Sequence, residues 1–446
     1  MSDLTKPGRN VVVTGIGILS PFGVGADALW ESLAAKRSGV SRVERLAYTA
    51  APDNMGGEIK NFGDKDVKKL FPKRQRKFAR VMCREIQLGV VSAILALKDA
   101  SLPLGDNGVE LEGLDHERFG VDFGANLMCS PPADLQSAAW SCAHDDDATH
   151  TFQFDEWGGK GLPSMEPLWL LKYLPNMPGC HIGIIADARG PNNSITIDEA
   201  SGNLAVGEGL RVIQRGRADI MIAGTTGTRL HPVKSLHAAL WDNLASSPDE
   251  PEKRSRPFDL NRTGQVLAEG AGSFILEEGS HARNRGADIV GTILGFGSSC
   301  VVSRDGSPQR SQALVNAIRT ALAEAQIEAG DIGHVNAHGL GSVVSDREEA
   351  KAILEVFGDF GRQVPVTAIK SYIGNCGSGC GPVELASSLL GLKHGVIPPT
   401  LNYETPDPEC PLNVVHGEAL PTDNKVFLKI NVTRMGQASA LVVAGV

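Results

Sequence analysis

The sequence predicts an α/β fold made of two related halves, and two observations support this prediction. Short apolar runs bounded by Gly or polar turns recur along the chain, and segments with helical apolar spacing lie between them. Such alternation is typical of α/β folds with largely parallel sheets. Each half also contains a strand, a turn of small residues and a buried helix, at residues 194–209 and 364–390. This similarity indicates an internal duplication.

The apolar runs predict strands at residues 10–19, 118–127, 194–197, 219–224, 272–278, 289–297, 364–369, 426–432 and 440–446. The helical spacing predicts helices at residues 26–35, 84–100, 201–216, 310–327, 346–358 and 381–395. Residues 254–272 are expected to cross between the halves, so we predict one half at 1–260 and the other at 261–446. Residues 129–170 lack clear periodicity. We interpret them as a cap or interface excursion, because long stretches of this kind in compact domains are usually functional or flexible.

Composition and charge argue against several classes of protein. The chain of 446 residues has a net charge of −9, whereas nucleic-acid binders usually contain a basic domain. No apolar run approaches the roughly 18 residues that span a bilayer, and the segment "MSDLTKPGRNVVVTGIG" lacks the features of a signal peptide. The eight Cys are scattered, and "CGSGC" has the wrong spacing for a zinc knuckle. We therefore expect a cytoplasmic protein with no metal, no nucleic-acid partner and no membrane segment.

The stretch "SITIDEASGNLAVGEG" raises the central chemical question. It predicts a buried strand, a tight turn and a helix, which is where many α/β enzymes present a nucleophile. Here the turn offers the carboxylates of Asp198 and Glu199 instead of a hydroxyl or a thiol. The free N–H groups and the dipole at a helix N-terminus favour an anion, so a carboxylate is compatible with this position.

Several further motifs resemble one family in order and spacing. They are "VVVTGIGILSPFGVGADALWESLAAKRSGV", "RGPNNSI", "RPFDLNRTGQVLAEGAG", "VNAHG", "KSYIGN" and "HGVIPPTLNYETPDPECPLNVV". Together they resemble the β-ketoacyl-acyl-carrier-protein synthases of the elongating type, and the resemblance runs nearly end to end. It implies a thiolase fold, that is, a duplicated five-layered αβαβα arrangement with two mixed sheets.

The resemblance also implies roles for individual residues. In the family, a Cys takes the acyl chain from a carrier thioester, and two His residues promote decarboxylation of the malonyl carrier. The Cys position falls on Glu199, the first His is His338, the second His position falls on Asn375, and the supporting Lys is Lys370. The bracing carboxylates match Asp346, Glu349 and Glu384. The positions that hold the pantetheine and form the gate match Leu340, Ser342, Arg434, Met435 and Gly436.

These departures change the expected chemistry. Condensation needs a covalent acyl-enzyme, and a carboxylate would give only a mixed anhydride that water cleaves. We therefore expect that Glu199 prevents elongation by the usual route. Cys376, beside Asn375, is a weaker candidate for a substitute nucleophile, because its side chain is expected to point elsewhere.

Two functions remain open, and the sequence leans to the first. One is decarboxylation of the malonyl carrier without condensation, with His338 and Asn375 as donors to the enolate oxygen. An ionised Glu199 about 4 Å from the malonyl carboxylate would cost roughly 4 kcal/mol at an effective dielectric near 20, so this function needs a pairing cation, for which Arg434 is the candidate, or a raised pKa. The alternative is a silent partner subunit, because "TIDEASG" also resembles the chain-length-factor branch. General-base chemistry by Glu199 on a bound thioester is a third hypothesis, which the sequence neither supports nor excludes.

The resemblance implies an acyl carrier protein as a partner, with its phosphopantetheine arm carrying the substrate and no other cofactor. The segment 64–80, "DKDVKKLFPKRQRKFAR", is strongly basic in an acidic chain. The docking candidates in it are Lys73, Arg74, Arg76 and Lys77, whose attraction for an acidic carrier should weaken with salt. The family forms two-fold dimers, so we expect either a homodimer or a heterodimer with a Cys-containing ketosynthase.

Overall fold

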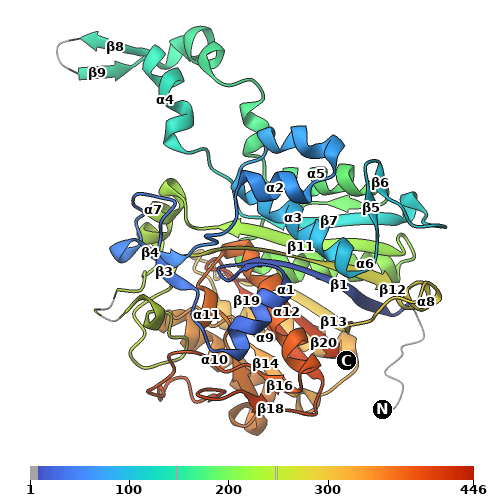
Figure 1. Ribbon diagram of the computed structural model, residues 1–446. Coiled ribbons are helices and arrows are strands. Elements are labelled where there is room, and N and C mark those ends of the chain that lie inside the picture. Colours follow the sequence, from blue (N-terminus) through green and yellow to red (C-terminus); the bar gives the residue numbers. More distant parts are fainter. Residues whose placement is uncertain (1–8, 147–148, 247, 249) are drawn as a thin grey trace.

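The computed structural model describes residues 9–146, 149–246, 248 and 250–446. The first eight residues, which begin the segment examined for a signal peptide, lie outside this range. Two half-sheets form the centre of the molecule (Figure 1). In the first, the order is β10 (Asn192–Asn193), β7 (Phe119–Ala125), β11 (Ile220–Thr228), β12 (Glu269–Glu278) and β1 (Val11–Ser20).

The second half-sheet repeats this order. Its strands are β15 (Pro365–Thr367), β14 (His334–Asn336), β19 (Val426–Val432), β20 (Gln437–Gly445) and β13 (Gly291–Cys300), with β17 (Asn413–Val414) added at the outer edge. β7 is parallel to both of its neighbours in the first half-sheet, as β14 is in the second. The pairings of β12 with β11 and β1, and of β20 with β19 and β13, are antiparallel. The shared topology confirms the predicted duplication. The half-sheets join where β1 pairs with β13 over three residue pairs.

Three expectations from the sequence differ from the structure. The strand–helix alternation suggested largely parallel sheets, but the last two strands of each half are joined antiparallel. The sheets are therefore mixed, as the family resemblance implied. β12 pairs with β1 and β11, so the first half extends through residue 278 rather than ending at 260. The strand predicted at 194–197 lies two residues earlier, as β10. The N–H of Ala125 still donates to the carbonyl of Ile195.

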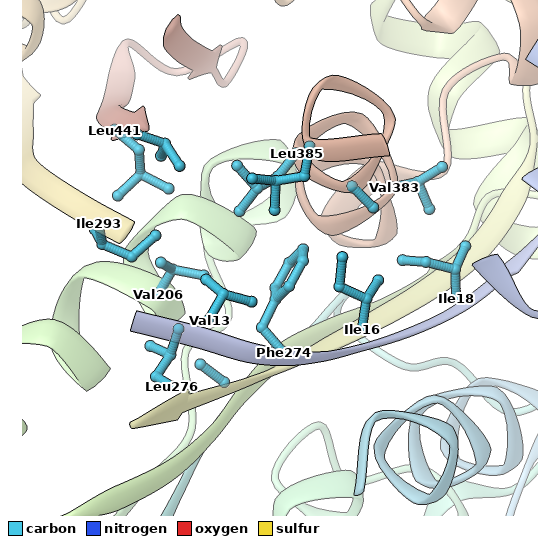
Figure 2. Close-up of a cluster of buried hydrophobic side chains, with 14 of the residues drawn as sticks. Val13, Ile16, Ile18, Val206, Phe274, Leu276, Ile293, Val383, Leu385 and Leu441 are labelled. Carbon is cyan, nitrogen blue, oxygen red and sulfur yellow. The ribbon is translucent and has the colours of Figure 1, made fainter. Parts of the chain in front are cut away.

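Helices complete five layers. α3 (Arg84–Asp99) and α5 (Met177–Ala186) cover the outer face of the first half-sheet. α9 (Arg310–Ala325) and α10 (Val343–Phe357) cover the outer face of the second. α6 (Ser201–Gln214) and α12 (Cys380–Lys393) lie between the half-sheets. Figure 2 shows the apolar core of this middle layer, where side chains of β1 and β12 face those of α6 and α12. Its labelled residues are Val13, Ile16, Ile18, Val206, Phe274, Leu276, Ile293, Val383, Leu385 and Leu441.

The two central helices approach each other very closely near their N-terminal ends. A Cβ atom on Gly202 would lie 2.9 Å from the Cα atom of Gly381, a distance that real Cβ atoms essentially never show. Glycine at both positions therefore lets the starts of α6 and α12 lie side by side. As a result, the turn that carries Glu199 and the turn that carries Asn375 meet at the same place.

The excursion leaves the body of the molecule as a projecting arm (Figure 1), which we define as residues 129–172. It contains α4 (Pro132–Ser141), a helix that the sequence did not predict, the hairpin of β8 (Ala143–Asp146) and β9 (Thr149–Phe152), and short turns from Phe154 to Lys172. Apolar side chains on the arm are exposed, among them Trp140, Phe154 and Leu168. Exposed apolar surface of this extent is typical of an interaction site.

The remaining elements connect and cap these layers. The shorter helices are α1 (Ala26–Ala34), α2 (Asp64–Leu70), α7 (Pro232–Trp241), α8 (Gly279–Asn284) and α11 (Lys370–Ile373), and two 3₁₀ turns, η2 (Lys73–Val81) and η8 (Asp198–Ala200), carry predicted site residues. The short strands are β2 (Gly23–Val24), β3 (Val40–Arg42), β4 (Met55–Gly57), β5 (Leu104–Gly105), β6 (Gly108–Val109), β16 (Val396–Ile397) and β18 (Leu420–Pro421).

Candidate active site

The turn before α6 presents Glu199 to a cleft, as the sequence predicted. η8 leads directly into α6, and Asp198 has a φ angle of 40°, a left-handed conformation that is uncommon for a residue other than glycine. Backbone strain of this kind persists only where the surrounding structure enforces it. Only 7% of the Glu199 side chain is exposed, so its carboxylate needs partners within the protein.

Arg229 is the cation that neutralises this turn. One of its terminal nitrogens, Nη2, donates to Glu199 Oε1 at 2.6 Å and to Asp198 Oδ2 at 2.9 Å. Burial opposes the charge, but Asp198 and Glu199 raise the pKa of the guanidinium above its usual value. Burial raises the pKa of Asp198 to about 6, with Arg229 opposing the rise and Glu199 adding to it. Two carboxylates thus share one buried cation.

Asn375 is the second partner of Glu199. Its Nδ2 group donates to Glu199 Oε1 at 2.9 Å and to Gln265 Oε1 at 2.6 Å, which occupies both of its hydrogens. Its Oδ1 atom accepts from the backbone N–H of Gly377 and from the thiol of Cys380. All four interactions agree on the orientation of the amide. The predicted pairing of His338 and Asn375 as two free donors is therefore wrong for this state, because Asn375 has no free N–H.

His338 is almost fully buried at the wall of the cleft, and its environment fixes its protonation. Lys370 Nζ and Asn431 Nδ2, both donors, each lie 3.3 Å from His338 Nδ1. Nδ1 must then be an acceptor, which leaves the proton on Nε2. Burial and the charges of Lys370 and Lys429 hold the pKa of His338 well below its usual value. The imidazole is therefore neutral and carries one N–H at Nε2.

The carboxylates predicted to brace the site do so in two ways. Glu384 accepts from Lys370 Nζ at 2.6 Å, from Lys429 Nζ at 2.8 Å and from Asn431 Nδ2 at 2.9 Å. Glu349 accepts the backbone N–H groups of His338 and Gly339, and burial raises its pKa to about 7. Asp346 accepts the N–H groups of Phe258 and Gly341 and pairs with Arg262, and burial raises its pKa to about 6.

A cleft of about 850 Å³ reaches this site from the surface, and Glu199, Arg229 and His338 all line it. Four of the predicted substrate-binding residues lie in its wall, namely Leu340, Ser342, Arg434 and Met435. The sequence made Arg434 the candidate cation for Glu199, but in the structure Arg434 does not pair with this carboxylate. Its guanidinium lies 4.4 Å from the ring centre of Trp241 at the end of α7, and Arg229 takes the expected place. Gly436, the fifth of these predicted residues, lies outside the cleft wall and turns the chain between β19 and β20 at a φ angle of 81°.

Other sequence candidates lie apart from the cleft. The docking candidates Lys73, Arg74, Arg76 and Lys77 are exposed on η2 and do not line the cleft. Cys376 is fully buried, and burial with Cys380 raises the pKa of its thiol, so it is not a nucleophile facing the cleft. Within the described ranges there is no group of side chains that would hold a metal ion. None of the helices described is long and apolar enough to cross a membrane.

Sequence reasoning missed Arg229, Gln265, Lys429 and Asn431. A signal for Arg229 was present, because it directly follows the strand that became β11. The carboxyl ends of parallel strands meet at one edge of a sheet, where α/β proteins place their binding residues. Gln265, Lys429 and Asn431 gave no comparable signal, because their roles depend on contacts between distant segments.

Comparison with known proteins agrees with this architecture. Residues 8–282 match the model of the β-ketoacyl synthase N-terminal domain, and residues 290–404 match that of the C-terminal domain. The chain is 34% identical to the tetracenomycin polyketide synthase ketoacyl synthase alpha subunit of Streptomyces glaucescens, over 98% of this chain and 97% of that protein. It is 31% identical to 3-oxoacyl-[acyl-carrier-protein] synthase 2 of Staphylococcus aureus (strain N315), over 93% of each chain.

Solved structures give the same result. The ishigamide ketosynthase/chain length factor is 28% identical with a TM-score of 0.80, and 98% of this chain aligns with all of that chain. A type II polyketide synthase acyl-carrier protein in complex with its ketosynthase bound to the hexaketide matches with 26% identity, the same coverage and a TM-score of 0.80. The boundary between the two matched domains, at residues 282–290, falls between β12 and β13, where the doubled sheet divides. The chain therefore belongs to the β-ketoacyl synthase family.

Proposed function

We propose that this chain is a ketosynthase-like subunit that carries no acyl chain itself and acts beside a Cys-bearing ketosynthase in polyketide or fatty-acid synthesis. The observation that carries the proposal is the closed set of contacts at Glu199. Its carboxylate accepts from Arg229 and Asn375 at 2.6 and 2.9 Å, so the position at which the family attaches its acyl group is filled by an ion pair. Transfer of an acyl group from a carrier thioester to a carboxylate would release the carrier thiol and give a mixed anhydride, which water cleaves.

The occupied donors of Asn375 favour this function over an independent catalyst. An enolate oxygen is usually stabilised by two or more donors that are free to receive it. Of the predicted pair, Nε2 of His338 is the donor that remains available, because both hydrogens of Asn375 already have acceptors. The likeness to a ketosynthase/chain length factor pair adds support for a heterodimer. The likeness to a ketosynthase bound by an acyl-carrier protein supports a carrier as a further partner, with substrates on its phosphopantetheine arm.

The test combines co-purification with intact mass. The tagged chain is co-expressed with each Cys-bearing ketosynthase of its source organism, and a stable complex is expected with one of them. Incubation of the isolated chain with an acyl carrier should leave its mass unchanged, whereas the Cys-bearing subunit should gain one acyl group. A stable acyl adduct on this chain would contradict the proposal. Product lengths that do not depend on this chain in the complex would contradict it as well.

Decarboxylation of the malonyl carrier is the second candidate, and the state of His338 favours it. His338 lines the cleft as a neutral imidazole that carries a donor N–H. The neutral form can polarise a thioester oxygen without holding the malonyl carboxylate as an ion pair. Glu199→Gln removes one negative charge from the cleft floor and should speed release of acetyl carrier. Equal or slower release from this variant than from the wild type would count against the candidate, and Glu208→Gln on α6, the helix that follows Glu199, is the matched control.

A further inference from the structure

Lys429 is a fully buried lysine that does not line the cleft. It lies on β19, two residues before Asn431, and donates to the carbonyl of Ile430 at 2.6 Å and to Glu384 Oε2 at 2.8 Å. Lys370 Nζ binds the other oxygen of the same carboxylate. Two buried ammonium groups therefore share one carboxylate. An excess of buried positive charge is costly, and burial lowers the pKa of Lys429.

The N–H groups of Lys370 and Asn431 leave these two side chains almost no alternative arrangement. Lys370 has three N–H groups, and its Nζ atom contacts His338 O at 2.8 Å, Glu384 Oε1 at 2.6 Å and His338 Nδ1 at 3.3 Å. Asn431 has two N–H groups on Nδ2, which contacts Glu384 Oε2 at 2.9 Å and His338 Nδ1 at 3.3 Å. If the Asn431 amide turned over, its oxygen would face the Glu384 carboxylate. Glu384 therefore determines which groups face Nδ1.

We propose that Lys429 is a positioning residue: by binding Glu384, it holds Lys370 and Asn431 against Nδ1 of His338 and so keeps the only proton of the imidazole on Nε2, as a fixed hydrogen-bond donor to the cleft. This inference goes beyond the partner-subunit function and deepens the second candidate, in which His338 donates to a thioester oxygen. It concerns the state of the side chain and does not require turnover.

Charge acts in the same direction as the contacts. Protonation of Nδ1 would place a third cation beside Lys370 and Lys429, with one carboxylate between them. Replacing Lys429 with Met keeps the length of the side chain and removes one of these cations. It also leaves Glu384 held by Lys370 and Asn431 alone, so that the carboxylate is freer to shift and the contacts of these two residues with Nδ1 loosen with it. The charged groups around the imidazole from all packed elements are Arg229, Arg310, Glu349, Lys370, Glu384 and Lys429.

The experiment reads the tautomer directly. The full chain is labelled with ¹⁵N at its eleven histidines, and the His338 signals are assigned by their loss in His338→Gln. In the wild type, His338 should show a protonated Nε2 and an unprotonated Nδ1 from pH 8 down to pH 5. In Lys429→Met, a population with a proton on Nδ1 should appear, and proton affinity should rise about tenfold, which is one pKa unit.

Lys425→Met is the matched control, because Lys425 lies just before the same strand, donates to the carbonyl of Leu392 and forms no ion pair with a carboxylate among the described residues. It should leave the His338 spectrum unchanged. An unaltered His338 tautomer and proton affinity in Lys429→Met would overturn the proposal, as would a wild-type His338 protonated on Nδ1. If Lys429→Met does not fold, Lys429→Gln replaces it, and failure of both while Lys425→Met folds would assign Lys429 to folding alone. None of these spectra involves a carrier or a partner, so this proposal fails separately from either function.

Discussion

The turn at Glu199 places two carboxylates on one guanidinium, whereas the cluster behind His338 places two lysines on one carboxylate. Both groups of charges lie beside the same cleft, and all of their members are buried except Asp198, whose side chain is 50% exposed. At the turn, every donor of Arg229 Nη2 and Asn375 Nδ2 is used within the protein. In the cluster behind His338, the contacts converge on Nδ1 and leave one N–H facing outward. The comparison teaches that the carboxylate at the turn is fully engaged by donors of the protein, whereas the imidazole keeps one N–H that these contacts do not use.

The strongest way to break this comparison is to remove Arg229, the cation that pairs with both carboxylates of the turn. Arg229→Leu leaves Asp198 and Glu199 without a counter-ion, and loss of one partner from a buried pair costs about 3–5 kcal/mol. Denaturant unfolding at pH 7.5 measures this loss. Arg434→Leu is the control, because it removes only a cation–π contact with an exposed Trp241, worth about 0.5–1 kcal/mol. Equal losses in the two variants would show that Arg229 does not bear the charge of the turn.

A smaller effect is expected from Glu199→Gln. The amide keeps the shape of the side chain and an oxygen for Arg229 and Asn375, but charge-assisted hydrogen bonds become neutral ones. Charged hydrogen bonds contribute about 1.5–3 kcal/mol and neutral ones about 0.5–1.5 kcal/mol, so the loss should be roughly 1 kcal/mol. Thermal unfolding of this variant beside Glu208→Gln gives the measurement. A loss as large as that of Arg229→Leu would mean that Glu199, and not the shared cation, dominates the turn.

Replacing Asp198, the second acid of the turn, should change the free energy of unfolding in the opposite direction. The folded protein raises the pKa of Asp198 from 3.8 to about 6, so it binds that proton more tightly than the unfolded chain does. The associated stability is present below pH 4 and is lost as the pH rises through 6. Asp198→Asn should therefore stabilise the protein at pH 8 relative to the wild type, and the difference should shrink toward pH 4. Asp346 and Glu349 titrate in the same range in both proteins, so the difference isolates Asp198. Destabilisation by Asp198→Asn that is equal at both pH values would contradict this assignment.

The smallest effect on stability is expected at the projecting arm. Phe154 is 81% exposed, so Phe154→Asp should change the free energy of unfolding by less than about 0.5 kcal/mol. If the arm binds a second subunit, the same change should weaken association, as measured by analytical ultracentrifugation of the complex. Tyr48, which is 78% exposed on the loop between β3 and β4, provides a matched control as Tyr48→Asp. Similar association of both variants would place the interface elsewhere.

The sequence predicted those parts of the molecule that depend on neighbours along the chain. The strands and helices of both halves, the turn at Glu199 and the loop of His338 follow from local pattern and from motifs. The pairing of Glu199 with Arg229 was not predictable in this way, because the two residues meet only when the end of β11 reaches the start of α6. The predicted partner, Arg434, was placed by analogy with a gate that this chain builds differently. α4 was missed because Ala138 is its one buried residue, so that its sequence has no apolar stripe at helical spacing.

The arm also has a consequence for how much of this protein a cell retains. Aromatic and aliphatic side chains such as Trp140, Phe154 and Leu168 remain in contact with water in the isolated chain. Surfaces of this kind promote aggregation and are recognised by chaperones and proteases. Until another molecule covers the arm, newly made copies would be short-lived. The steady level of the protein would then follow the supply of its binding partner more closely than the transcription of its own gene.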